Sequence, residues 1–122
     1  PKLNFDIKTR NTKVADDVYE VVLVLTAEAQ LEEETAFVVE VHQAGIFTVK
    51  EFSETDLERV LATVCPSILF PYSRESLDAL VVKGSFPPLM VAPINFEALY
   101  AQQKQAAEQQ ATSGEAASES VQ

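Results

Sequence analysis

The chain is poor in the side chains that most often carry chemistry. Its 122 residues contain one histidine, His42, one cysteine, Cys65, and no tryptophan. A lone cysteine cannot form a disulfide within the chain, and a zinc site needs three or four protein ligands, usually nitrogen or sulfur. A cysteine nucleophile would need His42 beside it. The apolar context of Cys65 and the strand position of His42 instead favour a buried thiol and a surface imidazole.

Basic residues are also scarce. Nine lysines and arginines stand against 19 acids, giving a formal net charge of −10. This charge disfavours nucleic-acid partners, because basic patches bind phosphate backbones, and it suits a basic partner. No apolar run approaches the roughly 20 residues that cross a membrane, and no phosphate loop or acid–base cluster stands out. We therefore expect no membrane insertion, no cofactor or metal and no enzymatic activity.

Length and composition predict one domain with a short tail. Core-forming residues end at about Tyr100, so we assign residues 1–101 to one folded domain. Alanine, glutamine and glutamate over residues 102–110 can extend the last helix, and the Ser- and Glu-rich residues 111–122 predict a disordered acidic tail. The lone cysteine fits a reducing compartment and no signal peptide is visible, so we expect a cytoplasmic protein.

Alternation of apolar and polar residues predicts a sheet in the first half of the chain. Residues 3–8 alternate, and a polar connection over residues 11–17 leads into a long strand over residues 18–29. The odd-numbered residues of the long strand are all apolar and should face the core. The lack of glycine in residues 31–34 predicts a hairpin loop longer than two residues. A strand over residues 35–43 follows, and Ala44-Gly45 breaks its pattern.

The second half of the chain has helical spacing. Ser53 or Thr55 can cap a helix over residues 56–64 that would bury Val64 among its apolar residues. A longer helix either starts near Pro71 or is kinked there, because proline lacks the N–H donor. Gly84 should end that helix.

A proline-rich apolar segment, SFPPLMVAP, separates the long helix from the last one. Its residues Phe86, Leu89 and Met90 could be core or could line an open groove, and Asn95 is placed to cap the last helix. Together these elements predict an α+β fold, an antiparallel sheet with helices packed on one face.

Four long motifs resemble the bacterial protein-export chaperone family SecB. They are ADDVYEVVL at residues 15–23, EETAFVVEVHQAGIF at residues 33–47, CPSILFPYSRESL at residues 65–77, and G-x-F-P-x-L-x-x-A-P-x-N-F-x-A-L at residues 84–99. The resemblance covers about residues 1–100. Members of the family carry a further N-terminal segment, with a first strand and a crossover loop, which we expect to be missing here.

The resemblance implies an ATP-independent holdase that keeps preproteins unfolded and hands them to the motor ATPase SecA. In the family, acidic and aliphatic residues of one sheet face dock SecA, and Val38 and Glu40 match two of these positions. Acids dominate residues 28–58, where Lys50 is the one cation. That stretch is either a solvated face or a docking surface for a basic partner.

The resemblance also implies a homotetramer, a dimer of dimers with the long helix at the contact between dimers. We expect the oligomer interface to include Val39, Val41, Gln43, Leu77, Leu80 and Val81. Unfolded clients would be held by non-directional apolar contact between the first strand and the last helix. This expected client groove consists of Leu3, Phe5, Ile7, Phe96, Leu99 and Tyr100.

Two alternatives stay open. A SecB-like chaperone dedicated to a toxin–antitoxin pair would share the mechanism but not the client. A small enzyme or ligand-binding domain, from a different class, would wrap its strands around a closed apolar pocket sized for one small molecule.

Overall fold

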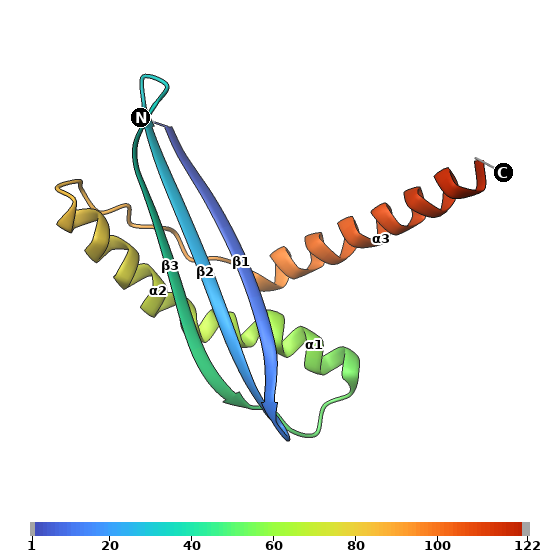
Figure 1. Cartoon of the computed structure of the whole chain (residues 1–122). Coiled ribbons are helices and arrows are strands. Elements are labelled where there is room, and N and C mark those ends of the chain that lie inside the picture. The colour runs from blue at the N-terminus through green and yellow to red at the C-terminus, as the bar shows by residue number, and fades with distance from the viewer. Residues whose placement is uncertain (1, 121–122) are drawn as a thin grey trace.

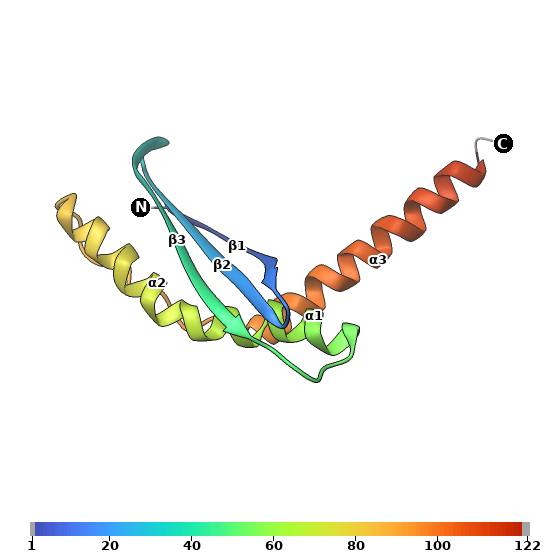
Figure 2. The same cartoon turned by 60° about the horizontal axis from the view of Figure 1, so that its bottom comes forward.

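The computed structural model describes the backbone of residues 2–120 and the side chains of residues 2–109. Within this range three strands come first, β1 (Lys2–Ala15), β2 (Val18–Leu31) and β3 (Glu34–Thr48). Three helices follow, α1 (Glu54–Ala62), α2 (Val64–Lys83) and α3 (Phe96–Ser120). The strands form one antiparallel sheet in the order β1-β2-β3. Figures 1 and 2 show α1 and α2 on one face of this sheet, so the α+β prediction is confirmed.

The strands are longer than the alternation predicted. β1 takes up residues 11–15 of the predicted polar connection, and its pairing with β2 continues past a register shift to Ala15 opposite Val18. β3 likewise runs through Ala44 to Thr48, with Gly45 opposite Val21. Pairing with the central strand outweighs the weak local preference of these polar and small residues, so both predicted breaks are wrong.

The β2–β3 hairpin closes with a two-residue turn although it contains no glycine. Leu31 pairs with Glu34, leaving Glu32 and Glu33 as the turn, so the prediction of a longer loop is wrong. Their φ angles are 52° and 70°, the left-handed conformation that a tight hairpin turn requires. Glutamate adopts this conformation at a cost, which is why composition did not reveal the turn.

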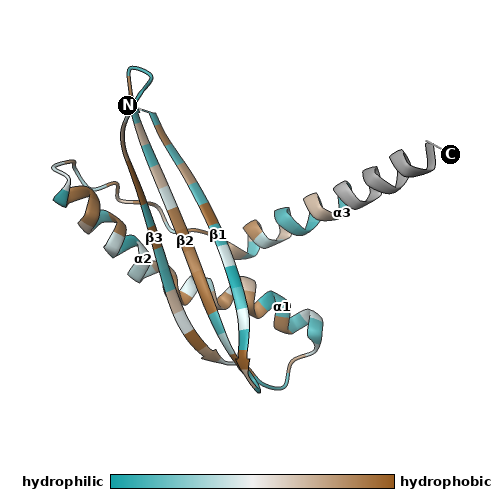
Figure 3. Ribbon diagram, in the orientation of Figure 1, coloured by the Kyte–Doolittle hydropathy of each residue, from teal (hydrophilic) through white to brown (hydrophobic). Residues whose placement is uncertain are grey.

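The core lies between the inner face of β2 and the helices. The odd-numbered residues of β2 from 21 to 29 are buried, as predicted. The main cluster joins them to α1, α2 and α3, and its buried members are Val21, Leu23, Leu25, Leu61, Cys65, Leu69, Phe70 and Phe96. A smaller cluster of Ala27, Val41 and Leu77 continues the core toward the hairpin. Figure 3 shows hydrophobic residues along the middle of β2.

Two apolar residues of β2 point to the open face of the sheet but are covered within the chain. Val22 and Val24 lie on this face but are 5% and 7% exposed. Their register partners on β1 are Arg10 and Lys8, whose aliphatic stems can cover an apolar neighbour while the charge stays in water. These two valines therefore need no partner protein to bury them.

Gly45 allows α2 to approach the sheet closely. A Cβ at this position would lie 2.8 Å from Leu69 Cδ2 and 3.0 Å from Phe47 Cε2. Carbon atoms in good contact are about 3.5–4.0 Å apart, so a side chain would not fit without movement. Gly45 is thus a packing residue within β3.

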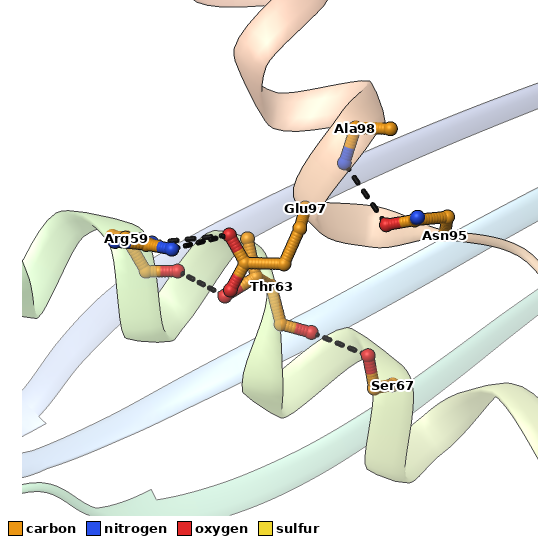
Figure 4. Close-up of polar contacts among 6 residues, drawn as sticks. All are labelled: Arg59, Thr63, Ser67, Asn95, Glu97 and Ala98. Atoms are coloured by element: carbon orange, nitrogen blue, oxygen red, sulfur yellow. Dashed lines mark hydrogen bonds and ion pairs between the residues drawn. The ribbon is translucent and has the colours of Figure 1, made fainter.

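The two ends of α1 confirm one prediction and overturn another. Ser53 caps α1, its Oγ accepting a hydrogen bond from the Asp56 N–H at 3.2 Å. Thr63 separates the helices and is buried, and its hydroxyl donates to the Arg59 carbonyl at 2.7 Å (Figure 4). Val64 begins α2 and is exposed, so its predicted burial is wrong, because the new helix turns it outward.

Pro71 lies inside α2, eight residues into its span, so the alternative in which a helix starts at this proline is excluded. At the other end Gly84 follows the last helical residue, as predicted, but with φ −81°. Ser85 instead adopts the left-handed conformation. The Phe86 N–H donates to the Val81 carbonyl and the Ser85 N–H to the Val82 carbonyl, the two bonds of a Schellman motif.

Helix α3 is fastened to the body by its first turns. Asn95 caps it as predicted, its Oδ1 accepting from the Ala98 N–H at 3.0 Å (Figure 4). Arg59 of α1 donates to Glu97 at 2.9 Å, and residues 101–109 are all exposed. The backbone is helical to Ser120, whereas composition predicted a disordered tail from residue 111. Residues 121–122 lie outside the described residues, and the division at residues 101 and 110 stays a prediction.

Candidate functional site

Four of the six expected client-groove residues belong to the core or pack directly on it. Phe96 is buried in the main cluster. Phe5, Ile7 and Leu99 are half-buried and pack against the same cluster. The inner face of β1 is therefore largely covered within one chain, and these residues do not form the open walls that we expected.

The two remaining residues line different hollows. Leu3 is exposed and lines an apolar hollow near the β2–β3 hairpin. Tyr100 lines a separate hollow of about 490 Å³ between α1 and α3, together with Asp56, Arg59 and Lys104. The second hollow is rich in charges and suits an apolar client poorly. The structure thus does not bring Leu3 and Tyr100 together.

The apolar hollow has a volume of about 320 Å³ and receives residues from all three strands and from the proline-rich loop. Its lining residues are Lys2, Leu3, Ala29, Leu31, Ala36, Phe37, Phe86, Pro87 and Leu89. The Phe37 and Phe86 rings lie 4.7 Å apart between centroids and are tilted by 54°. The sequence left open whether residues of the proline-rich loop are core or line an open groove. Phe86 and Leu89 line this hollow, so the second alternative holds for them.

Sequence reasoning missed Leu31 and Phe37 as members of this hollow. Phe37 lies on the inner face of β3, and the tight hairpin brings it beside Leu31 at the end of the sheet. Leu3 and Leu31 are exposed, so the hollow opens to the surface. The small-ligand hypothesis required a closed pocket, and this one is not closed.

A carboxylate of α2 holds the loop that walls the hollow. Asp78 Oδ1 accepts hydrogen bonds from the backbone N–H groups of Leu89, at 3.0 Å, and Met90, at 3.4 Å. Met90 has φ 52° and is 78% exposed. Met90 is therefore not a core residue, although the sequence allowed that interpretation.

The predicted docking pair, Val38 and Glu40, lies on the opposite face of the sheet. Both side chains are exposed, and Val38 is 60% accessible. Glu40 accepts a hydrogen bond from Thr26 Oγ1 at 3.1 Å and lies 3.2 Å from His42 Nε2. The hydrogen bond from His42, and then that from Thr26, lowers the pKa of Glu40. The carboxylate is thus kept ionised beside an exposed aliphatic side chain.

The expected interface residues are mostly occupied within the chain. Val41, Leu77 and Val81 are buried, and Val39 and Gln43 are half-buried. Leu80 is the exposed member of the set. A buried residue cannot contact a second chain directly, but it can affect assembly by setting the position of α2. The role of these residues in assembly therefore stays a prediction.

The outward face of α2 carries an apolar stripe that the sequence did not reveal. Val64, Ile68, Tyr72 and Val82 are exposed, and the first three are spaced four residues apart on the helix. Pro71 hid this stripe, because it broke the helical pattern from which the stripe would have been found.

The catalytic and metal hypotheses gain no support. Cys65 is buried in the core, where burial raises the pKa of its thiol, whereas His42 is exposed on the far face of the sheet. Among the described residues no group of three or more His, Cys, Asp or Glu side chains could hold a metal ion. No helix in the same part of the chain is long and apolar enough to cross a membrane.

The described residues offer an apolar hollow on one face of the sheet, an ionised Glu40 beside Val38 on the other, and exposed apolar side chains on α2. Exposed apolar surface of this kind is typical of a protein-binding domain. The comparisons with known proteins name its family. The family model described as preprotein translocase subunit SecB matches residues 1–107. The chain belongs to the SecB family.

Curated relatives agree with this assignment. The protein-export protein SecB of Hahella chejuensis is 51% identical over 118 residues, which make up 95% of this chain and 74% of that protein. The protein of the same name from Nitrosococcus oceani is 52% identical over 105 residues, 86% of this chain. The chain spans 64% of the length of that relative, slightly under two thirds.

A solved structure supports the fold. The SecB-like chaperone of Mycobacterium tuberculosis, solved in complex with a ChAD peptide from the HigA1 antitoxin, superimposes with a TM-score of 0.58 at 22% identity. The match covers 77% of this chain and 74% of that chain. At this identity the likeness shows the fold alone.

Proposed function

We propose that this chain acts as an ATP-independent export chaperone, a cytoplasmic holdase that binds unfolded preproteins and delivers them to SecA. The observation that carries the proposal is the open apolar hollow at the hairpin end of the sheet, in a chain of the SecB family. The relatives at 51% and 52% identity are named protein-export proteins.

The hollow would bind apolar side chains of a client with little sequence specificity. Apolar burial contributes roughly 25 cal/mol per Å² and has no directional requirement. A volume of about 320 Å³ accommodates little more than one large side chain. A client must also offset the entropy of ordering its own chain. Several hollows on an assembly are thus required for useful affinity.

Association of several copies of the chain would supply those further hollows, one from each copy. The exposed stripe of Val64, Ile68 and Tyr72 on α2 is apolar surface that a second copy can cover. We therefore propose a homotetramer, built as a dimer of dimers, with α2 at the contact between dimers.

Client and motor would occupy opposite faces of the sheet. Phe37 lines the hollow on the inner face, while its neighbours Val38 and Glu40 lie on the open face. SecA docked on Val38 and Glu40 would thus leave the hollow accessible, and a bound client would leave the docking pair free. This separation suits a chaperone that must hold a client while it docks.

The test separates the two faces. Glu40→Lys should weaken SecA binding, because it reverses the charge of an exposed, ionised carboxylate, and should leave suppression of client aggregation intact. Glu58→Lys makes the same charge change on exposed α1 and serves as the control. Affinity for SecA is measured by calorimetry at low and moderate salt. Equal affinities of wild type and Glu40→Lys at both salt concentrations would refute the docking assignment.

A toxin–antitoxin chaperone is the second candidate, since the matching solved structure is named as a complex with an antitoxin peptide. The higher identity to protein-export proteins favours export. Strong binding of an antitoxin peptide with no binding of unfolded preproteins would reverse that preference.

A further inference from the structure

The loop between α2 and α3 depends on one carboxylate for its shape. It has no helix or strand between Gly84 and Asn95, and its two ends are fixed by the Schellman motif and by the Asn95 cap. Between these ends, Asp78 Oδ1 accepts from two successive backbone N–H groups, at 3.0 Å and 3.4 Å. Hydrogen bonds to an ionised acceptor are among the stronger ones in proteins.

Those two bonds hold a strained segment. Met90 lies in the left-handed region with φ 52°, which is uncommon for a residue with a long side chain. Its side chain is 78% exposed, so packing does little to offset the strain. Asp78 makes no ion pair among the described residues, and its carboxylate is thus free to serve the two N–H groups.

The held segment is also a wall of the apolar hollow. Leu89 donates its N–H to Asp78, and its side chain packs on the cluster of Ala27, Val41 and Leu77 and lines the hollow. Phe86 and Pro87 of the same loop complete that wall. Phe86 is held beside Phe37 by its own bond to the Val81 carbonyl, whereas the position of the Leu89 part of the wall depends on where Asp78 places the loop.

We propose that Asp78 is a positioning residue for client binding, which fixes the loop at Leu89 and Met90 and so sets the width of the apolar hollow. The inference rests on the proposed function, because it assumes that clients enter this hollow. Without the carboxylate, Met90 can leave the left-handed conformation and the Leu89 part of the wall loses its fixed position. Clients would then bind more weakly, since each binding event must also order the loop.

The test compares Asp78→Ala, Asp78→Asn and, as a matched control, Glu75→Ala, which removes an exposed acid from the same helix. The client is reduced, carboxymethylated α-lactalbumin, with its affinity measured by calorimetry well below the melting temperature of each variant. We expect Asp78→Ala to lose about tenfold in affinity, Asp78→Asn about threefold, and Glu75→Ala less than about twofold. Asn keeps an acceptor oxygen but loses the charge, which gives it the intermediate value.

The single methionine of the chain provides an independent reading of the loop. In a chain labelled at the methionine methyl group, the Met90 signal should move toward the position of a disordered peptide in Asp78→Ala and stay in place in Glu75→Ala. If Asp78 only stabilised the fold, its removal would lower the melting temperature and leave the affinity unchanged.

The outcomes separate the inference from the proposed function. A wild-type chain that bound no client would overturn the proposed function and this inference with it. Wild-type binding with equal affinity in all variants, or an unmoved Met90 signal in Asp78→Ala, would overturn the inference alone. Should Asp78→Ala fail to fold, the threefold loss expected for Asp78→Asn decides the question.

Discussion

Replacing Gly45 by alanine tests how closely α2 must approach the sheet. The added Cβ would lie 2.8 Å from Leu69 Cδ2, at least about 0.7 Å inside an ordinary carbon–carbon contact. The ring of Phe47 is 3.0 Å away and blocks a small shift of the new methyl group. Leu69 is buried among close-packed neighbours and cannot turn aside freely.

Two effects of opposite sign decide the magnitude. Alanine restricts the unfolded chain more than glycine does, which favours the folded state by about 0.4–1 kcal/mol. Overpacking a core costs about 1–3 kcal/mol. Because the contact is short on two sides, we expect overpacking to dominate and the free energy of unfolding to fall by about 1–2 kcal/mol.

Urea unfolding at one fixed chain concentration measures this loss, since assembly makes stability concentration-dependent. Gly84→Ala is the control, because its Cβ would have no neighbour closer than 3.4 Å and its φ of −81° suits alanine. In Gly45→Ala the further change Leu69→Ala should cost less than it does alone, as expected for residues in contact. A Gly45→Ala chain as stable as wild type, or additive effects in the double variant, would refute the packing argument.

The remaining predictions concern assembly and docking. Ile68→Asp with Tyr72→Asp should give a folded species smaller than wild type by light scattering, because both side chains are exposed on the α2 stripe; an unchanged mass with unchanged circular dichroism would exclude that interface. As pH falls, SecA binding should be lost at a lower pH than the ordinary titration of a glutamate would give. The hydrogen bonds from His42 and Thr26 depress the pKa of Glu40 in the folded chain, so its charge is lost only as pH passes below that lowered value. An identical pH profile in His42→Ala would contradict this.

Strong periodicity and capping chemistry made much of the fold predictable. The inner face of β2 was identifiable because every odd position is apolar, and Ser53 and Asn95 were identifiable because a short polar side chain precedes a helical pattern. The lengths of β1 and β3 could not be predicted, because their ends are held by pairing with β2 and not by the strand propensity of their own residues. Similarly, α2 stays helical through Pro71 because buried residues on both sides of it, such as Phe70 and Leu77, are fixed by tertiary packing.

The candidate site likewise has a part that the sequence could predict and a part that it could not. Val38 and Glu40 lie two residues apart on one strand, so alternation alone placed them on one face. The apolar hollow joins residues of three strands and a loop, and no local pattern connects Leu3 with Phe86. Leu99 and Tyr100 do not form the expected wall because α3 leaves the body after its first turns, where it contacts α1 and α2 (Figure 2).

The position of β1 at the edge of the sheet has a consequence for solubility. Within residues 2–120 its outer side faces no strand. It carries four cations, Lys2, Lys8, Arg10 and Lys13, against one acid, Asp6, which pairs with Lys8. Two copies of this strand meeting edge to edge would bring an excess of positive charge together, and such pairing is disfavoured. This charge thus disfavours edge-to-edge pairing of identical chains, the step by which fibrils grow. It does not disfavour pairing with a neutral or acidic strand of another polypeptide.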